Sequence, residues 1–475
     1  MKKLFGILAS IALSVVMLLS GCSLKGKDGY DGRDGKDGQN VTIEDIYNKY
    51  VAEHGEISFE DFLREYLSYS DEEIKDAVSL RAAINRSLMS GVTVLTKFPY
   101  TSYRPSVFGQ TAQTTYKMFT GSGAILWMDK GAGDAYVVTN CHVIYDDSSD
   151  TTYCPDIRLY LYGQDTAGVN YVTTSSDITG DENYRIPAQI VGASVNYDIA
   201  LLKVTGSTVL QRSDAIAVSD KQSVVEALKD CFVTNEAEAT IIGETVYAIG
   251  NASGEGMSAS NGIISKDSEY IDVSISDSNS NLSNSFRVLR TTAPINHGNS
   301  GGGLFNTSGK LVAIVQAKDD AEDVDNMGYA LPANCVHRLL VAMYENEGKP
   351  ISGSSGKKYG ISKAYLNIQT VVSDSYARLN EKGIAVIYET VRVKSIEGSP
   401  AEGKLQENDV LLTAKLISAD GKTVKEEIKI THNYSLSEML ISAREGDTLE
   451  LGIERNKAET KVSIVFKSDY FKYFE

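Results

Sequence analysis

Residues 298–302 read Gly-Asn-Ser-Gly-Gly, and this stretch decides the fold that the 475-residue sequence predicts. Glycines on both sides of a serine let the backbone turn sharply and hold the hydroxyl out. They also let a substrate carbonyl approach backbone N–H groups, which is how an oxyanion is stabilised. The stretch therefore predicts that Ser300 is a nucleophile.

A serine hydroxyl is a weak nucleophile at neutral pH and needs a base beside it. Of the five histidines, His142 follows the apolar run Tyr136–Thr139, which predicts a strand that ends at the base. The base needs an orienting carboxylate, and Asp198 directly precedes the apolar run Ile199–Val204. The order His142, Asp198, Ser300 is that of chymotrypsin.

The string Gly-Asn-Ser-Gly-Gly also fits the nucleophile elbow of α/β-hydrolases, in which the histidine follows the serine. Two histidines follow Ser300 in this chain. His337 lies in residues 334–343, which are predicted to be helical, and His432 lies near the C-terminus. Neither has the context of a base, so both are interpreted as structural.

Three blocks of sequence together resemble the signature of the HtrA/Deg family of serine proteases. They are T-N-C-H-V at 139–143, Y-D-I-A-L-L-K at 197–203 and G-N-S-G-G-G-L at 298–304. Gly-Ser-Gly-Ala-Ile at 121–125 and Asn-Met-Gly-Tyr-Ala-Leu-Pro at 326–332 resemble two further family segments. The blocks occur in the order of the family.

The resemblance implies a mostly β fold, with a chymotrypsin-like double β-barrel over residues 91–347. It implies that His142 is the general base, that Asp198 orients it, and that Ser300 forms an acyl-enzyme which water then hydrolyses. Backbone N–H groups of the nucleophile loop would form the oxyanion hole, at Gly298, Asn299 and Ser300.

By the same resemblance, the residues before the nucleophile loop help to line the substrate pocket. These residues are Ala293, Pro294 and Ile295. None of them is acidic, so we expect a preference for small or medium aliphatic residues over Lys or Arg. The expected substrates are misfolded or selected envelope proteins in extended form. The alternative from a different class is a non-hydrolytic chaperone or peptide-binding lipoprotein on a protease-like fold.

A second unit is expected over residues 359–475, after a Gly- and Ser-rich linker at 348–358. Three of its segments resemble the core of a PDZ domain: 383–387, 398–401 and 405–411. Such α+β domains bind extended peptides by adding a strand to a sheet edge. Tyr359-Gly360-Ile361 is a partial match to the loop that binds a peptide's C-terminal carboxylate.

The N-terminus reads as an export signal at residues 1–21, with two lysines followed by an apolar run. The string Leu-Ser-Gly-Cys at 19–22 resembles a bacterial lipobox, which implies lipid attached to Cys22. The expected location is therefore the extracytoplasmic side of a cell membrane. A Gly-Asp-rich linker at 22–41 and a helical segment at 42–90 with capping-box spacings follow.

The composition excludes several classes of partner. The net charge of −17 argues against nucleic acid, because phosphate binding needs a basic surface. No metal-ligand cluster or dinucleotide fingerprint is present, so no cofactor and no metal are expected. Apart from Cys22 four cysteines remain, none in a C-x-x-C pair, and their pairing stays open: Cys141, Cys154, Cys231 and Cys335. The family resemblance implies homotrimers.

Overall fold

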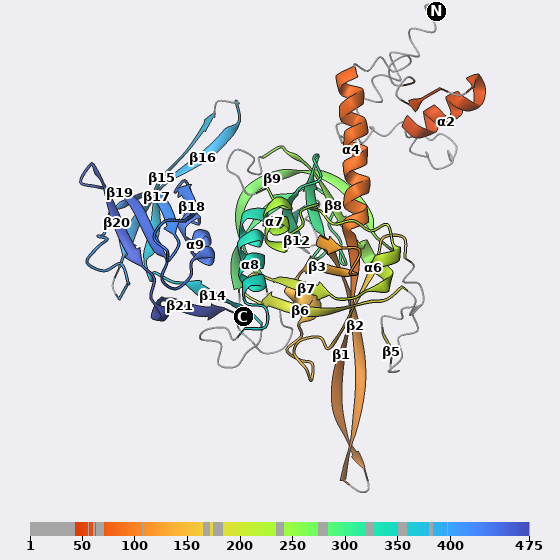
Figure 1. Ribbon diagram of the computed structural model, residues 1–475, viewed down its shortest axis with the longest axis horizontal. Coiled ribbons are helices and arrows are strands. Elements are labelled where there is room, and N and C mark those ends of the chain that lie inside the picture. The colour runs from red at the N-terminus through yellow and green to blue at the C-terminus, as the bar shows by residue number, and fades with distance from the viewer. Residues whose placement is uncertain are drawn as a thin grey trace, which may run out of the picture. The chain divides into compact units, whose positions relative to one another are not determined.

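The structure is a computed structural model (Figure 1). Its described residues are 43–55, 57–59, 62, 71–106, 109–164, 172–173, 184–233, 242–273, 284–318, 327–349, 359–379, 383–396 and 398–474. The expected export signal, Cys22 and the Gly-Asp-rich linker lie outside the described residues, as do residues 350–358 of the second linker. The chain divides into two compact units, residues 1–82 and residues 83–475.

The first unit contains the helix α2 (Ile43–His54) and most of α4 (Asp71–Ser90), which both lie in the segment expected to be helical. Phe62 is only 2% exposed. The ring of Tyr47 meets the rings of Phe59 and Phe62 edge-on, with centroids 5.2 and 5.4 Å apart. This aromatic cluster gives the small unit its core.

The second unit begins with a closed antiparallel barrel (Figure 1). Its order is β1-β4-β6-β7-β3-β2, and β1 pairs again with β2. The strands are β1 (Gly91–Ser106), β2 (Gly109–Asp129), β3 (Asp134–Thr139), β4 (Asp156–Leu161), β6 (Ile186–Ser194) and β7 (Ile199–Val204), with the short β5 (Val172–Thr173) pairing with β2. The run Ile199–Val204, predicted to be a strand, is β7 itself.

A second barrel follows in the order β10-β13-β12-β11-β8-β9. Its strands are β8 (Thr245–Gly250), β9 (Ser258–Val273), β10 (Asn284–Thr291), β11 (Gly303–Asn306), β12 (Leu311–Lys318) and β13 (Gly328–Pro332). Each barrel closes around aliphatic side chains that alternate along its strands. The expectation of a mostly β, chymotrypsin-like double barrel is confirmed.

Short helices connect the strands. They are α5 (Cys141–Ile144), α6 (Thr208–Arg212), α7 (Val224–Asp230) and the 3-10 helix η2 (Ala252–Gly254), and the longer α8 (Ala333–Glu345) follows β13. The side chains of Ser207 and Ser223 cap α6 and α7. The histidine of the candidate site differs from expectation: β3 ends at Thr139, and His142 lies on α5 instead of at a strand end.

The C-terminal part is an α+β arrangement around a six-stranded sheet. Along the path β15-β16-β17-β19-β20, β18 pairs with β17, while β14 and β21 form a separate two-stranded sheet. The elements are β14 (Ile361–Ala364), β15 (Gln369–Leu379), β16 (Ala385–Ser395), β17 (Val410–Ile417), β18 (Val424–Lys429), α9 (Ser435–Met439), η3 (Leu440–Ser442), β19 (Thr448–Arg455), β20 (Ala458–Val465), η4 (Ser468–Tyr470) and β21 (Phe471–Phe474).

Buried charges join this part to the second barrel. Glu438 on α9 accepts from Nε of Arg287 at 2.5 Å, and Arg338 on α8 lies 3.5 Å away. Arg287 and Glu438 are each 7% exposed. Ile361 and Ile441 belong to the same apolar cluster as the buried side chains of α8. The two parts therefore share a core as well as an ion-pair network.

Candidate active site

Asp198 holds His142 by both carboxylate oxygens. Oδ2 lies 2.7 Å from His142 Nδ1, and Oδ1 accepts the backbone N–H of His142 at 2.8 Å. Asp198 is 1% exposed, whereas about a third of the His142 side chain (34%) is exposed. The carboxylate thus fixes the ring from the protein side and leaves the other ring nitrogen, Nε2, for chemistry.

The pKa of His142 reflects this contact. Burial alone would lower it, but the charge of Asp198 and the hydrogen bond to its carboxylate outweigh burial and raise the pKa above 6.5. A base with a raised pKa binds a proton more strongly.

The backbone of Asp198 is also constrained. Its φ is 50°, an uncommon value for a residue with a side chain. Two buried amides stabilise the turn through the Asp198 carbonyl, because Asn140 Nδ2 donates at 2.8 Å and Gln316 Nε2 at 3.2 Å. Asn140 and Gln316 are at most 1% exposed. They tie the acid to the base's own segment and to β12 of the second barrel.

Ser300 lies in the tight turn between Ile295 and β11. The turn requires glycine at Gly298 and Gly301, whose φ values are 96° and 84°. A Cβ at Gly298 would lie 2.1 Å from the carbonyl oxygen of Asn251. The Ser300 carbonyl accepts the N–H of Ser122 at 2.8 Å, which anchors the turn to β2.

The hydroxyl of Ser300 donates to the backbone carbonyl of Gln316 at 3.1 Å. Among the described residues, no hydrogen bond joins it to His142. Gln316 therefore contacts both parts of the candidate site, through its carbonyl to Ser300 and through its side chain to Asp198. Catalytic hydrogen bonds are often long or misaligned before substrate binds, so this geometry is that of a resting site.

The three residues expected to form the oxyanion hole differ in whether their backbone N–H groups are already hydrogen-bonded. Within the described part of the chain, the N–H groups of Gly298 and Ser300 have no hydrogen-bond acceptor. The N–H of Asn299 instead donates to the carbonyl of Asn296 at 3.0 Å. Two donors are thus available to a developing oxyanion, and the third is already used by the turn.

The peptide between His297 and Gly298 is held from outside the turn. The His297 carbonyl accepts the N–H of Ser253 at 2.7 Å. In a trans peptide the C=O and N–H point in opposite directions, so this bond turns the Gly298 N–H away from Ser253. Ser122 adds a second restraint, since its hydroxyl donates to the Gly298 carbonyl at 2.6 Å and accepts the N–H of Asn251 at 2.7 Å.

Sequence reasoning had not assigned roles to Ser122 or Gln316. Each is a buried polar residue flanked on both sides by glycine or apolar residues, and that signal could have marked them: Ser122 is 0% exposed and Gln316 is 1% exposed. Buried polar groups are nearly always hydrogen-bonded, so a lone one in a core strand indicates a partner worth finding.

Two of the three residues that were expected to line the substrate pocket have buried side chains. Ala293 and Ile295 are 0% and 7% exposed and belong to the core of the second barrel. Pro294 between them is exposed, and its carbonyl accepts the hydroxyl of Ser260 at 2.9 Å. The alternation of a strand-like segment explains this, because neighbouring side chains point to opposite sides. Of the three side chains, only that of Pro294 faces solvent.

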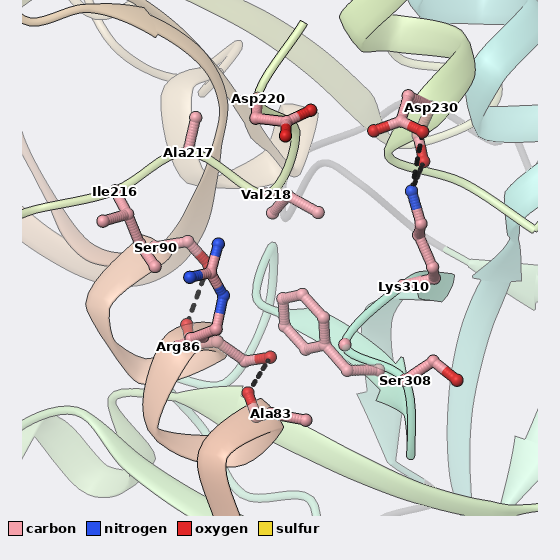
Figure 2. A pocket seen from close by; sticks show the side chains of 13 residues that line it. Ala83, Arg86, Ser90, Ile216, Ala217, Val218, Asp220, Asp230, Ser308 and Lys310 are labelled. Atoms are coloured by element: carbon pink, nitrogen blue, oxygen red, sulfur yellow. Dashed lines mark hydrogen bonds and ion pairs between the residues drawn. The ribbon is translucent and has the colours of Figure 1, made fainter. Parts of the chain in front are cut away.

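A cavity of about 190 Å³ lies elsewhere in the second unit (Figure 2). It is bordered by the last turns of α4, the segment 216–220 and the turn between β11 and β12. Lys310 on its wall donates to the carbonyl and the carboxylate of Asp230. His142, Asp198 and Ser300 do not line it, so this cavity is not the candidate active site.

The described residues also bear on the expectations for cysteines, metal ions and membrane spans. All four cysteines there are buried and free, and burial raises the pKa of each thiol: Cys141, Cys154, Cys231 and Cys335. No group of three or more His, Cys, Asp or Glu side chains within the described ranges could hold a metal ion. None of the helices that the structure describes has the length and apolar character of a membrane span.

Residues 121–314 match the family model described as "Trypsin-like peptidase domain". The matched range includes His142, Asp198 and Ser300. Together with the double barrel, the match defines a trypsin-like peptidase domain.

Similar proteins of known name give a finer comparison, and the chain spans about two thirds of the first one's length. The chain is 27% identical over 364 residues to "Serine protease Do-like HtrA" of Bacillus subtilis (strain 168), covering 74% of this chain and 65% of that protein. It is 24% identical over 403 residues to "Serine protease Do-like HtrA" of Lactococcus lactis subsp. lactis (strain IL1403), covering 82% and 83%. The chain is thus similar to proteins named as HtrA serine proteases, the family that its sequence blocks resemble.

Solved structures of similar proteins carry related names. "HtrA-type protease AlgW with tripeptide" matches with a TM-score of 0.45 and 18% identity, covering 83% of this chain and 97% of that chain. "HtrA-type protease AlgW with decapeptide" matches with a TM-score of 0.44 and 18% identity, covering 83% and 99%.

Proposed function

We propose that the chain is a serine endopeptidase of the HtrA type, with Ser300 as nucleophile, His142 as general base and Asp198 as the residue that orients the base. The observation that supports it most is the two-point contact between Asp198 and His142. A carboxylate that binds both a ring nitrogen and the backbone of the same histidine fixes the ring's tautomer and its direction.

The proposed reaction begins when the Ser300 hydroxyl exchanges the Gln316 carbonyl for His142 Nε2. Ser300 Oγ attacks the scissile carbonyl and His142 takes its proton, while Asp198 stabilises the resulting imidazolium. The N–H groups of Gly298 and Ser300 stabilise the oxyanion. His142 then protonates the leaving amine, and water activated by the same histidine hydrolyses the acyl-enzyme.

The proposed substrates are unfolded or selected polypeptides of the cell envelope, cut after small or medium aliphatic residues. Of the three residues before the nucleophile loop only Pro294 faces solvent, and it carries no negative charge that could pair with a basic side chain. The proposed location is the outer face of a cell membrane, through lipid on Cys22. A homotrimer is the proposed assembly, and peptide binding at residues 359–475 is the proposed regulatory function of the C-terminal part.

Casein digestion by the parent chain and by Ser300→Ala tests the proposal, with cleavage sites mapped by mass spectrometry. We expect cleavage by the parent, after aliphatic residues, and none by the variant. Equal digestion by both would overturn the assignment of Ser300. If the parent leaves casein intact while preventing its aggregation, the chain is a non-hydrolytic chaperone instead.

A further inference from the structure

The edge of β14 (Ile361–Ala364) is covered by a segment of the same chain. β14 pairs antiparallel with β21 (Phe471–Phe474), from Ile361 opposite Phe474 to Ala364 opposite Phe471. The ladder continues through the N–H of Tyr365, which donates to the carbonyl of Tyr470 at 2.7 Å. Figure 1 shows the two strands side by side, apart from the six-stranded sheet.

The side chains of β21 alternate as those of a bound peptide strand do. Phe471 and Tyr473 are half-buried, whereas Lys472 between them is exposed. Phe471 packs on Phe466 with ring centroids 6.0 Å apart, and the Tyr473 hydroxyl donates to the Tyr359 carbonyl. Backbone bonds to a strand edge, with every second side chain in a contact, are the marks of recognition by strand addition.

The two strands are held to different degrees. Ile361 and Ala364 of β14 are 0% exposed, so β14 is part of the core. In the described part of the chain β21 pairs with no strand other than β14, and its described side chains stay partly in solvent. Segments with few buried contacts open at low free energy without unfolding the rest. β21 can therefore leave while β14 and the main sheet remain.

β14 also contacts the candidate active site's surroundings. Lys363 is 8% exposed, and its ammonium group donates to the hydroxyl of Tyr197 at 2.9 Å and to Ser437 on α9 at 3.1 Å. Tyr197 directly precedes Asp198. A peptide on the β14 edge thus pairs with the strand that carries Lys363. Through Lys363 this strand contacts Tyr197, the residue before the orienting carboxylate.

We propose that the β14 edge is a peptide-binding site whose resident occupant is β21. An extended peptide with aromatic side chains at alternate positions binds there by displacing β21. The proposal rests on the proposed peptide-binding function of residues 359–475, and it adds to that function an internal competitor and a class of ligand. A closed edge lowers the apparent affinity for peptide by the fraction of molecules in which β21 is released.

Two variants at one position distinguish the contribution of the β21 backbone from that of a β21 side chain. Hydrogen-bonded pairs alternate along an antiparallel ladder, so the bond from Tyr365 to Tyr470 puts Lys472 and Lys363 in a bonded pair as well. Lys472→Pro removes the N–H and breaks the ladder. Lys472→Ala keeps the N–H and loses only the contact between the ammonium group and the Tyr365 ring, 3.8 Å from its centroid.

The probe is a fluorescently labelled heptapeptide with the sequence of residues 468–474, Ser-Asp-Tyr-Phe-Lys-Tyr-Phe. Fluorescence anisotropy measures its binding to the full chain and to both variants. We expect Lys472→Pro to bind the probe at least tenfold more tightly than the parent, and Lys472→Ala to resemble the parent. A control heptapeptide with serine in place of Phe471 and Tyr473, the two alternate aromatic residues that contact the chain, should bind the Pro variant at least tenfold more weakly than the probe.

Equal binding by Lys472→Pro and the parent, or no binding by either, would overturn the proposal. A second variant that ends at Lys467 lacks β21 altogether and must show the same gain, so misfolding of one variant does not decide the result. Casein hydrolysis in the same preparations separates the two hypotheses. Failed probe binding with intact hydrolysis rejects only the β14 site, and absent hydrolysis by the parent rejects only the proposed peptidase.

Discussion

The two halves of the candidate active site are prepared to different degrees. On the side of the first barrel, Asp198 already holds His142 through both oxygens, at 2.7 and 2.8 Å. On the side of the second barrel, the Ser300 hydroxyl donates a hydrogen bond to the carbonyl of Gln316. The difference teaches that the fold already holds the base in place, while the hydroxyl of the nucleophile is hydrogen-bonded to a backbone carbonyl instead of to the base. Preparing the base in advance lowers the reorganisation needed in the reaction.

The first half is most directly broken by Asp198→Asn. The amide of asparagine has one oxygen, so it cannot accept both the ring Nδ1–H and the backbone N–H of His142 as the carboxylate does, and the ring adopts the wrong tautomer. We expect kcat for a peptide substrate to fall by about 10⁴. Asp214→Asn is the control, because Asp214 is 97% exposed and should leave kcat unchanged. An Asp198 variant that retains a tenth of the parental kcat would contradict the assignment.

The second half is broken by Gly298→Ala. The new Cβ would lie 2.1 Å from the Asn251 carbonyl, at a backbone φ of 96°, so the turn must move and misplace an oxyanion donor. We expect kcat to fall by about 10²–10³ with little change in KM. Gly309→Ala is matched in backbone, with φ 77° and its nearest neighbour atom 3.8 Å away. Equal losses in the two variants would show that strain alone is responsible.

Ser122→Ala tests the second half more finely, because it removes a hydroxyl that holds the nucleophile turn and leaves the oxyanion donors in place. It leaves the Gly298 carbonyl and the Asn251 N–H without the partner they share. We expect a loss of about 1–3 kcal/mol in unfolding free energy, measured by urea titration. kcat should fall about tenfold, less than for loss of a donor itself. Ser149→Ala, also buried and hydrogen-bonded, is expected to change stability without changing kcat.

The pH dependence tests the first half by a smaller effect. Catalysis needs neutral His142, and Asp198 raises the pKa of that ring above 6.5. The acidic limb of kcat/KM should therefore lie above pH 6.5, and the residual activity of Asp198→Asn should show a limb at lower pH. The contact stabilises the protonated ring, so its stability is full below pH 6.5 and lost as pH rises through the folded-state pKa. A parental limb below pH 6.5 would refute this account.

The strands that sequence predicted well are those whose burial is continuous. Residues 199–204 are apolar except for Lys203, and they form β7. His142 was expected at a strand end because the apolar run continues toward it. The chain instead turns at Asn140, where Asp198 from a distant segment captures the His142 N–H. The pairing of β21 with β14 was not predicted either, because a half-buried edge strand leaves no continuous apolar run and depends on a distant partner.

The central claim is that His142 activates Ser300. It is tested most directly by labelling the full chain with a fluorophosphonate and mapping the adduct by mass spectrometry. The account predicts an adduct on Ser300 of the parent, none on Ser300→Ala, and labelling slowed at least a hundredfold in His142→Ala. An adduct on another serine, or equal labelling rates with and without His142, would contradict it.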